Sequence, residues 1–506
     1  MKGLAAAAKE IGSLDLRALA AQRVAIALVL LADLALRAPH IRAHYTDEGV
    51  LPREALRELI AYPWRWSLHS LGGSSGFEAL LFAVALVAGL ALLLGYRTRL
   101  ATFASWLLLI SLHTRNPMLL TGGDTELRMI LFWGLFLPWG SRGSVDGALA
   151  RRRGTEPTSR VVSALACRAY TLQIVSVYLF SVLLKSGADW QTDHTAIYYA
   201  MSIDQMATTL GRWLLDWPEV LAALVPVVLA TEAIAPLLLV VPQRWPWPRL
   251  AGMVALAGMH ATFILTMNLG IFPWLCGAAL LGFLPGRLLD GLSPVVDRWL
   301  ARDSIARRLD RLVTRIDRSD PRIGPLSGGS WAEPATLALL GCSMLYVLQW
   351  NLGTIDPAWR VPRSLRWYSQ VARLDQEWDM FAPRPYRDDG WFVLPGVLRD
   401  GTPVDARTGG PVVWEKPDSV SDSLGYYRWR KYLRRIWMKR NKRHRLYYGR
   451  YLCRESKRAA HPETDLETFE IFYMLEWTPA PGEPSREVER RQIWRHRCGL
   501  RSKGTL

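Results

Sequence analysis

Long apolar runs constrain this chain more than any other feature of its sequence. Half of the 506 residues are hydrophobic, and they gather into runs between about Val24 and Leu352. Many runs have roughly the 17–23 residues needed to cross a hydrocarbon layer, and flanking residues extend the shorter ones. The pattern predicts an all-α polytopic membrane protein with about nine spans. The expected spans are Val24–Arg37, Phe77–Leu94, Leu100–Leu112, Glu126–Leu137, Val162–Leu184, Val220–Val241, Leu250–Met267, Ile271–Leu284 and Pro334–Leu352.

Charge in the connecting segments predicts the orientation of the spans. Arginines gather after the second, fourth, sixth and eighth spans, whereas aspartates and glutamates gather in the opposite loops. Because short basic loops stay in the cytoplasm, the N-terminus is expected on the cytoplasmic side of the plasma membrane. An odd number of spans then places the C-terminal tail on the exterior side. If the seventh and eighth spans form one re-entrant element, the tail lies inside instead. Orientation is also the first explanation of the net charge of +17.

The apolar runs divide the chain into five expected parts. Residues 1–23 form an N-terminal interfacial segment, and residues 24–290 form the main transmembrane domain. A basic cytoplasmic loop covers 291–332, and the last span covers 333–352. Residues 353–506 form an exterior accessory domain that is expected to be β-rich. Within it, residues 391–405 predict two strands around an Asp-Gly turn, and residues 467–477 predict another strand.

A basic and aromatic segment, residues 426–448, lies between these expected strands. It fits a helix that lies on anionic lipid. Nucleic-acid binding is chemically possible, but the exterior position argues against it, and no nucleic-acid partner is expected. Cys453 and Cys498 are able to form a disulfide if the tail is outside. No metal-ligand spacing appears in the sequence, so no metal is expected.

Lys185 is the first candidate for a catalytic residue. It ends the apolar run Tyr178–Leu184, and a low dielectric disfavours its ammonium form, which would make the amine a base or a nucleophile. Asp189, four residues further on, would either orient and recharge the amine or, if too close, hold it protonated. The alternative interpretation is a structural lysine whose stem lies in lipid and whose head reaches water.

Other polar residues are expected to gather at the outer face near Lys185. Ionisable groups within spans are rare and usually functional. His260 therefore either tunes the lysine or joins two helices by a hydrogen bond. Asp33 and Arg37 are one helical turn apart and are expected to pair with each other. The pairs Asn116-Pro117 and Gly122-Gly123 lie between the third and fourth expected spans. Their alternative role is to shape a turn. The residues expected to bind a substrate or cofactor are Trp190, His113, Asn116 and Asp124.

Several short motifs, in a shared order, resemble the HTTM (horizontally transferred transmembrane) domain family, which includes the vitamin K-dependent gamma-carboxylase of animals. The resemblance covers about residues 19–285, and one motif in the tail is typical of the bacterial members. The motifs are Asp33, Tyr45-Thr-Asp-Glu-Gly49, Leu94-Gly-Tyr-Arg97, Ser144-Val-Asp-Gly147, Lys185-x-x-Ala-Asp-Trp190, His260 with Gly270 and Phe272, and Trp378-Asp-Met-Phe-Ala-Pro383.

The resemblance implies an integral membrane enzyme that acts on a reduced, vitamin K-like quinone. In the carboxylase a lysine deprotonates the hydroquinone, and Lys185 and His260 stand in place of that lysine and of a histidine in the same site. The reaction would then be epoxidation or a carboxylation-like lyase step. The chain departs from the carboxylase at Leu184, Phe263 and Leu265, where the carboxylase has lysine, asparagine and glutamine. The alternative is a non-quinol membrane protein that matures or exports a secreted peptide. Membrane lipid is an expected partner under either function, and a secreted peptide or protein is a possible second one.

Overall fold

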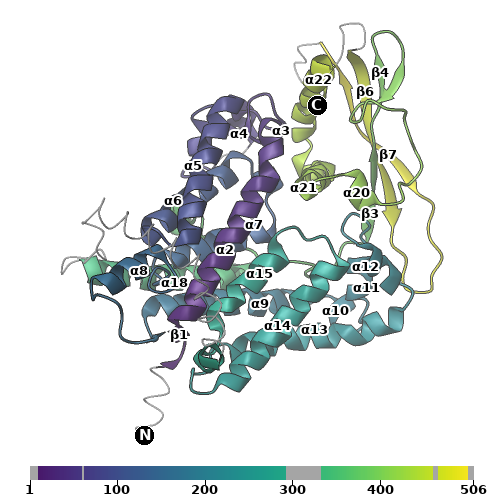
Figure 1. The fold of residues 1–506 in the computed structure, drawn as a ribbon. Coiled ribbons are helices and arrows are strands. Elements are labelled where there is room, and N and C mark those ends of the chain that lie inside the picture. Colours follow the sequence, from purple (N-terminus) through teal and green to yellow (C-terminus); the bar gives the residue numbers. More distant parts are fainter. Residues whose placement is uncertain (1–9, 60–61, 292–331, 460–464, 500–506) are drawn as a thin grey trace, which may run out of the picture.

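The computed structural model describes residues 10–59, 62–291, 332–459 and 465–499. The expected basic loop at 291–332 lies almost wholly outside the described residues. A bundle of helices forms one side of the molecule, and the tail packs against it with a β-sheet and several helices (Figure 1). The membrane-type helical fold with a C-terminal sheet is therefore confirmed in its coarse form.

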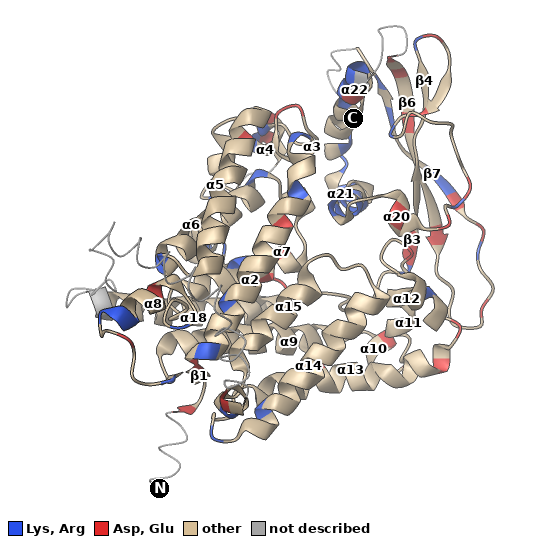
Figure 2. Ribbon diagram, viewed as in Figure 1, with Lys and Arg blue, Asp and Glu red and all other residues tan. Residues whose placement is uncertain are grey.

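Six helices in the described residues are long and apolar enough to cross a membrane. Charged residues are scarce along most of their length (Figure 2). The expected count of nine is not confirmed, because three of the expected spans are shorter or less apolar helices: α6 (Thr98–Arg115), α7 (Gly122–Gly134) and α15 (Phe272–Leu280). A helix the length of α7 covers only about 20 Å, less than the hydrocarbon layer, and most of its residues are buried within the bundle. The six long helices are α2 (Leu16–Arg37), α5 (Ser75–Leu94), α9 (Leu165–Leu184), α13 (Pro218–Leu238), α14 (Pro246–Thr266) and α18 (Ala332–Ile355).

Local capping explains where several of these helices begin and end. The Asp15 side chain accepts a hydrogen bond from the backbone N–H of Arg17 and caps α2. Residues 16–23 form the first turns of α2, and most of them are buried. The interfacial segment expected at 1–23 stays a prediction. Ser74 caps α5 in the same way, and α5 ends at Gly95, whose positive φ of 66° suits glycine.

The tail contains a five-stranded antiparallel sheet built around one long strand, β6 (Leu466–Trp477). This strand pairs with β3 (Asp388–Val393) and β4 (Pro395–Leu398) along one edge and with β7 (Glu489–Arg497) along the other. Strand β5 (Pro403–Asp405) pairs with β4 across a turn in which Gly401 has a φ of 90°. The strands expected at 391–405 and 467–477 are thus confirmed.

The tail also contains helices, so it is a mixed domain rather than a purely β one. Helix α21 (Tyr427–Trp437) lies between the helical bundle and the sheet (Figure 1). The expectation that this basic segment lies on lipid is wrong for α21, because Arg428, Tyr432 and Leu433 are fully buried against protein. Helix α22 (His444–Ala459) carries Cys453, which forms a disulfide with Cys498.

Shorter elements connect these parts. They are β1 (Leu14–Asp15), α3 (Ile41–Tyr45), α4 (Arg53–Leu59), η3 (Pro117–Leu119), α8 (Val145–Arg152), β2 (Val161–Val162), α10 (Ala188–Gln191), α11 (Ala196–Met201), α12 (Thr209–Leu214), α19 (Arg366–Ala372), α20 (Val420–Ser423) and η7 (Lys439–Asn441).

Candidate functional site

Lys185 lies at the C-terminal end of α9, where Ser186 and Gly187 follow the helix. The residue is only 3% exposed. Its Nζ donates a 2.9 Å hydrogen bond to Oγ of Ser181, one turn earlier, and forms an ion pair with the carboxylate of Glu232 on α13. The Nζ also lies 4.9 Å from the centre of the Trp190 ring. The amine therefore faces a carboxylate, a hydroxyl and an indole ring. The interpretation of Lys185 as a structural residue required its head to reach water, and it does not.

The short helix α10 joins this region to the tail. Asp189 accepts hydrogen bonds from Arg387 at 2.6 Å and from the Thr195 hydroxyl at 3.2 Å. The indole N–H of Trp190 donates to the backbone carbonyl of Phe381 at 2.9 Å. Asp189 is thus paired with the tail, and Glu232 takes the place beside Lys185 that the sequence suggested for Asp189.

His260 connects α14 to α9 inside the bundle. Its Nε2 is 2.8 Å from the hydroxyl of Tyr178, and the edges of its ring meet Phe263 and Phe272. The other ring nitrogen, Nδ1, is buried and has no hydrogen-bond partner among the residues that the structure describes. Because Tyr178, Ser181 and Lys185 are three and four residues apart, they share one face of α9. This face carries two polar pairs, one to α14 and one to α13.

A second buried cluster holds the tail against the helical bundle. Arg428 of α21 forms ion pairs with Asp33 at 2.6 Å and with Asp124 at 2.8 Å. Arg37 pairs with the same two carboxylates, including the expected Asp33 contact at 2.7 Å, which is confirmed. His113 lies 3.3 Å from Asp124. Two guanidinium groups thus balance two carboxylates in a fully buried site, where an unbalanced charge is expensive.

Asn116 and Asp124 also shape the backbone before α7. The Asn116 side chain donates to the carbonyl of His44 at 2.7 Å and accepts from the N–H of Met118 at 3.1 Å. Asp124 forms a capping box with Thr121 at the start of α7. The expected role in a turn is therefore present for Asn116, whereas Asp124 caps a helix and also forms ion pairs.

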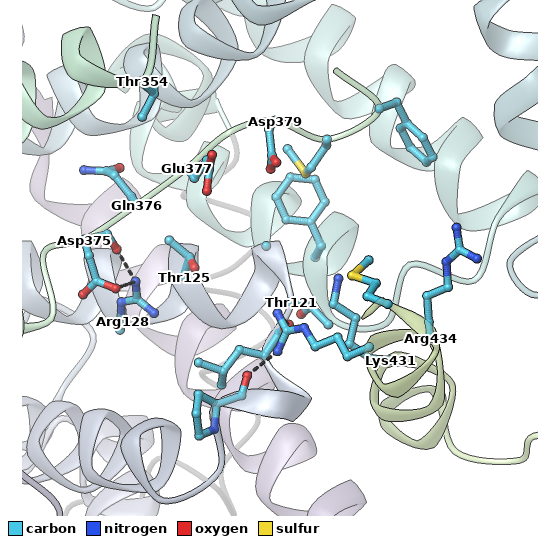
Figure 3. A pocket seen from close by; sticks show the side chains of 18 of the residues that line it. Thr121, Thr125, Arg128, Thr354, Asp375, Gln376, Glu377, Asp379, Lys431 and Arg434 are labelled. Carbon is cyan, nitrogen blue, oxygen red and sulfur yellow. Dashed lines mark hydrogen bonds and ion pairs between the residues drawn. The ribbon is translucent and has the colours of Figure 1, made fainter. Parts of the chain in front are cut away.

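A cavity of about 950 Å³ lies between the helical bundle and the tail. Its walls come from the segment before α7, the start of α15, the end of α18, residues 360–389 of the tail, and one face of α21 (Figure 3). None of the seven residues predicted for the site lines this cavity. Two of them lie directly behind its wall. Trp190 is hydrogen-bonded to the lining residue Phe381, and the His260 ring packs on the lining residue Phe272.

Three functional candidates were missed by reasoning from sequence. Glu232 is the one acidic residue in the interior of the apolar run at 220–241, and such a group was a signal for a buried partner. Arg428 and Lys431 stand among many basic residues of the tail, and nothing local singles them out. In the described part of the chain, no group of three or more His, Cys, Asp or Glu side chains is placed to hold a metal ion.

Comparison of the chain with protein-family models, with curated proteins and with solved structures finds no match. The likeness to the carboxylase family therefore stays a prediction from the sequence motifs.

Proposed function

We propose that this protein is an integral membrane enzyme of carboxylase-like type, in which Lys185 and Glu232 together perform acid–base chemistry on a reduced quinone. The observation that carries the proposal is the buried Lys185–Glu232 pair between two apolar helices. The amine and the carboxylate are in direct contact and shielded from water, so one proton can be exchanged between them without solvent. In the proposed reaction the neutral amine is the form that accepts a proton from substrate.

The neighbouring residues support the same proposal. Ser181 accepts a hydrogen bond from Nζ, and the Trp190 ring, 4.9 Å from Nζ, is hydrogen-bonded to Phe381 of the tail. His260 and Tyr178 form the second polar pair on the same helix face. We assign them a positioning role, because their hydrogen bond fixes how α9 packs on α14.

The proposal is tested by turnover of a reduced naphthoquinone by the purified full chain in detergent. We expect formation of the epoxide in the presence of oxygen, and loss of turnover by at least 100-fold in Lys185→Ala and in Glu232→Gln. The matched control is Lys439→Ala, which removes an exposed lysine of the tail. Wild-type protein that leaves the quinol unchanged, or a Lys185→Ala variant that turns over at the wild-type rate, contradicts the proposal.

The alternative expectation, maturation or export of a secreted peptide, stays a prediction. Deletion of the tail does not separate the two functions, because Arg428 of the tail neutralises two carboxylates inside the bundle. The quinol assay separates them without a deletion. Turnover of the small substrate without any peptide supports the enzyme, whereas a purified chain that is inert towards quinol but needed for secretion of a peptide supports the alternative.

We further propose that the tail lies on the exterior side of the membrane. The arginine-rich loops on the opposite side and the Cys453–Cys498 disulfide support this orientation, since disulfides persist in oxidising compartments. Thiol labelling of denatured protein from intact cells checks it. Cys453 and Cys498 are expected to react with maleimide only after reduction, whereas Cys167, Cys276 and Cys342 are free and serve as the internal control. Full labelling of all five cysteines before reduction contradicts the exterior location.

A further inference from the structure

One face of α21 makes a positively charged wall of the cavity. Arg430 and Arg435 donate hydrogen bonds to backbone carbonyl oxygens of the helical bundle, and among the described residues neither has a carboxylate partner. A carbonyl oxygen holds a guanidinium in place but does not cancel its charge. The wall therefore keeps a positive potential towards the cavity. The carbonyl groups belong to Gln205, Asn268, Pro117 and Leu120.

Lys431 stands between these arginines, and its side chain reaches into the cavity (Figure 3). Its amine has no hydrogen bond or ion pair with any residue that the structure describes. Burial and the charge of Arg435 lower the pKa of Lys431 to about 8, although Asp379 opposes this shift. The amine is thus a mostly protonated donor at neutral pH that still lacks an acceptor. An unpaired, half-buried cation of this kind is available to a ligand.

Two carboxylates make a negatively charged wall opposite α21. Residues 374–379 belong to no helix or strand, and their burial alternates, with every second side chain buried in the protein. Leu374 and Trp378 are fully buried, whereas Glu377 and Asp379 are exposed and face the cavity across from Lys431 (Figure 3). Neither carboxylate forms an ion pair with a described residue. Their neighbour Asp375 differs, because Arg65, Arg128 and Arg373 already neutralise it.

We propose that this cavity binds a zwitterionic group, with its anionic part at Lys431 and its ammonium part at Glu377 and Asp379. The two walls offer opposite charges that lack internal partners, and a ligand with both charges satisfies them together. A phosphoethanolamine group has this chemistry, with a phosphate and a primary ammonium a few bonds apart. The inference is independent of the reaction proposed for Lys185.

The surroundings of the cavity indicate how such a group reaches it. The end of α18, a candidate membrane span, contributes Gly353 and Thr354 to the lining. Trp359 and Trp367 follow in sequence and are 57% and 45% exposed. Exposed tryptophans are typical of the headgroup level of a membrane. A lipid headgroup can therefore supply the zwitterion, and a free soluble molecule with the same groups is the other source.

Binding to the purified full chain in detergent tests the proposal with three probes: dihexanoyl-phosphatidylethanolamine, O-phosphoethanolamine, and dihexanoyl-phosphatidylglycerol, which has the phosphate but no ammonium. We expect the ethanolamine lipid to bind at least tenfold more tightly than the glycerol lipid. Lys431→Met should weaken both lipids at least tenfold, and Glu377→Gln with Asp379→Asn should abolish the preference between them. Competition by O-phosphoethanolamine identifies a soluble source, and its failure to compete identifies a lipid.

Lys439→Met is the matched control, because this lysine is eight residues further along, exposed and outside the cavity. A second measurement covers the case in which Lys431→Met does not fold. In wild-type protein at pH 8, the ethanolamine lipid is supplied in large excess over the acetylating reagent, so that most of its own amine stays unmodified, and it should protect Lys431, but not Lys439, from acetylation. Equal binding of the two lipids, absence of binding by every probe, or equal labelling of Lys431 with and without lipid overturns the proposal.

Discussion

Arg428→Met is expected to destabilise the whole protein, and not only the tail. The substitution leaves Asp33 and Asp124 in a fully buried site, where Arg37 is the one remaining guanidinium partner in the described part of the chain. Breaking a buried ion pair by removing one partner costs about 3–5 kcal/mol, because the remaining charge stays desolvated. We therefore expect a large drop in the thermal unfolding temperature of the detergent-solubilised chain. Resistance of the helical bundle and of the sheet to protease should be lost together.

Matched variants separate this effect from a general loss of positive charge. Arg443→Met removes an exposed arginine of the same basic segment, whose ion pair with Glu58 lies at the surface, and should cost less than about 1 kcal/mol. Arg428→Lys keeps the charge, but a lysine ammonium lacks the planar set of donors with which the guanidinium binds both carboxylates. We therefore expect a loss of stability between those of the two methionine variants. Adding Asp33→Asn to Arg428→Met should recover part of the stability. Equal stability of the Arg428→Met and Arg443→Met variants would show that the tail is not anchored in this way.

The helices and strands were predictable because their signals are local. Apolar runs gave the positions of the long helices, and Asp400-Gly401 gave the turn between β4 and β5. The number of spans was overestimated, since a run of apolar residues is equally suited to a helix buried in protein. Helix α7 shows this, because Asp124 and Arg128 within it are buried by ion pairs and carbonyl contacts with the tail.

The site was less predictable, because its partners are distant in sequence. Arg428 is 395 residues from Asp33 and 304 from Asp124, so no spacing rule connects them. The basic character of α21 suggested a lipid surface, whereas its arginines are held by carboxylates and carbonyls inside the protein. For Lys185, proximity in sequence favoured Asp189, but the carboxylate 47 residues away on α13 is the actual partner. The rule that charged residues within membrane spans pair with one another held for Lys185. Which carboxylate it pairs with could be known only from the packing of α9 on α13.

A double-mutant cycle on Lys185 and Glu232 is expected to separate their structural role from their chemical role. Lys185→Met leaves a buried carboxylate, and Glu232→Leu leaves a buried ammonium, so each should cost about 3–5 kcal/mol of unfolding free energy. The double variant replaces both charges by apolar side chains of similar size and should be more stable than either single variant. Thermal unfolding of the four proteins in the same detergent measures this coupling.

Turnover of reduced naphthoquinone by the same four proteins gives the second half of the cycle. If the pair performs the proton transfer, stability returns in the double variant but turnover does not, because no amine or carboxylate remains to accept a proton from substrate. If the pair only joins α9 to α13, turnover should follow stability and recover in the double variant. Recovery of both quantities would assign Lys185 and Glu232 to the scaffold, and the reaction would then have to be sought among the charged residues that line the cavity.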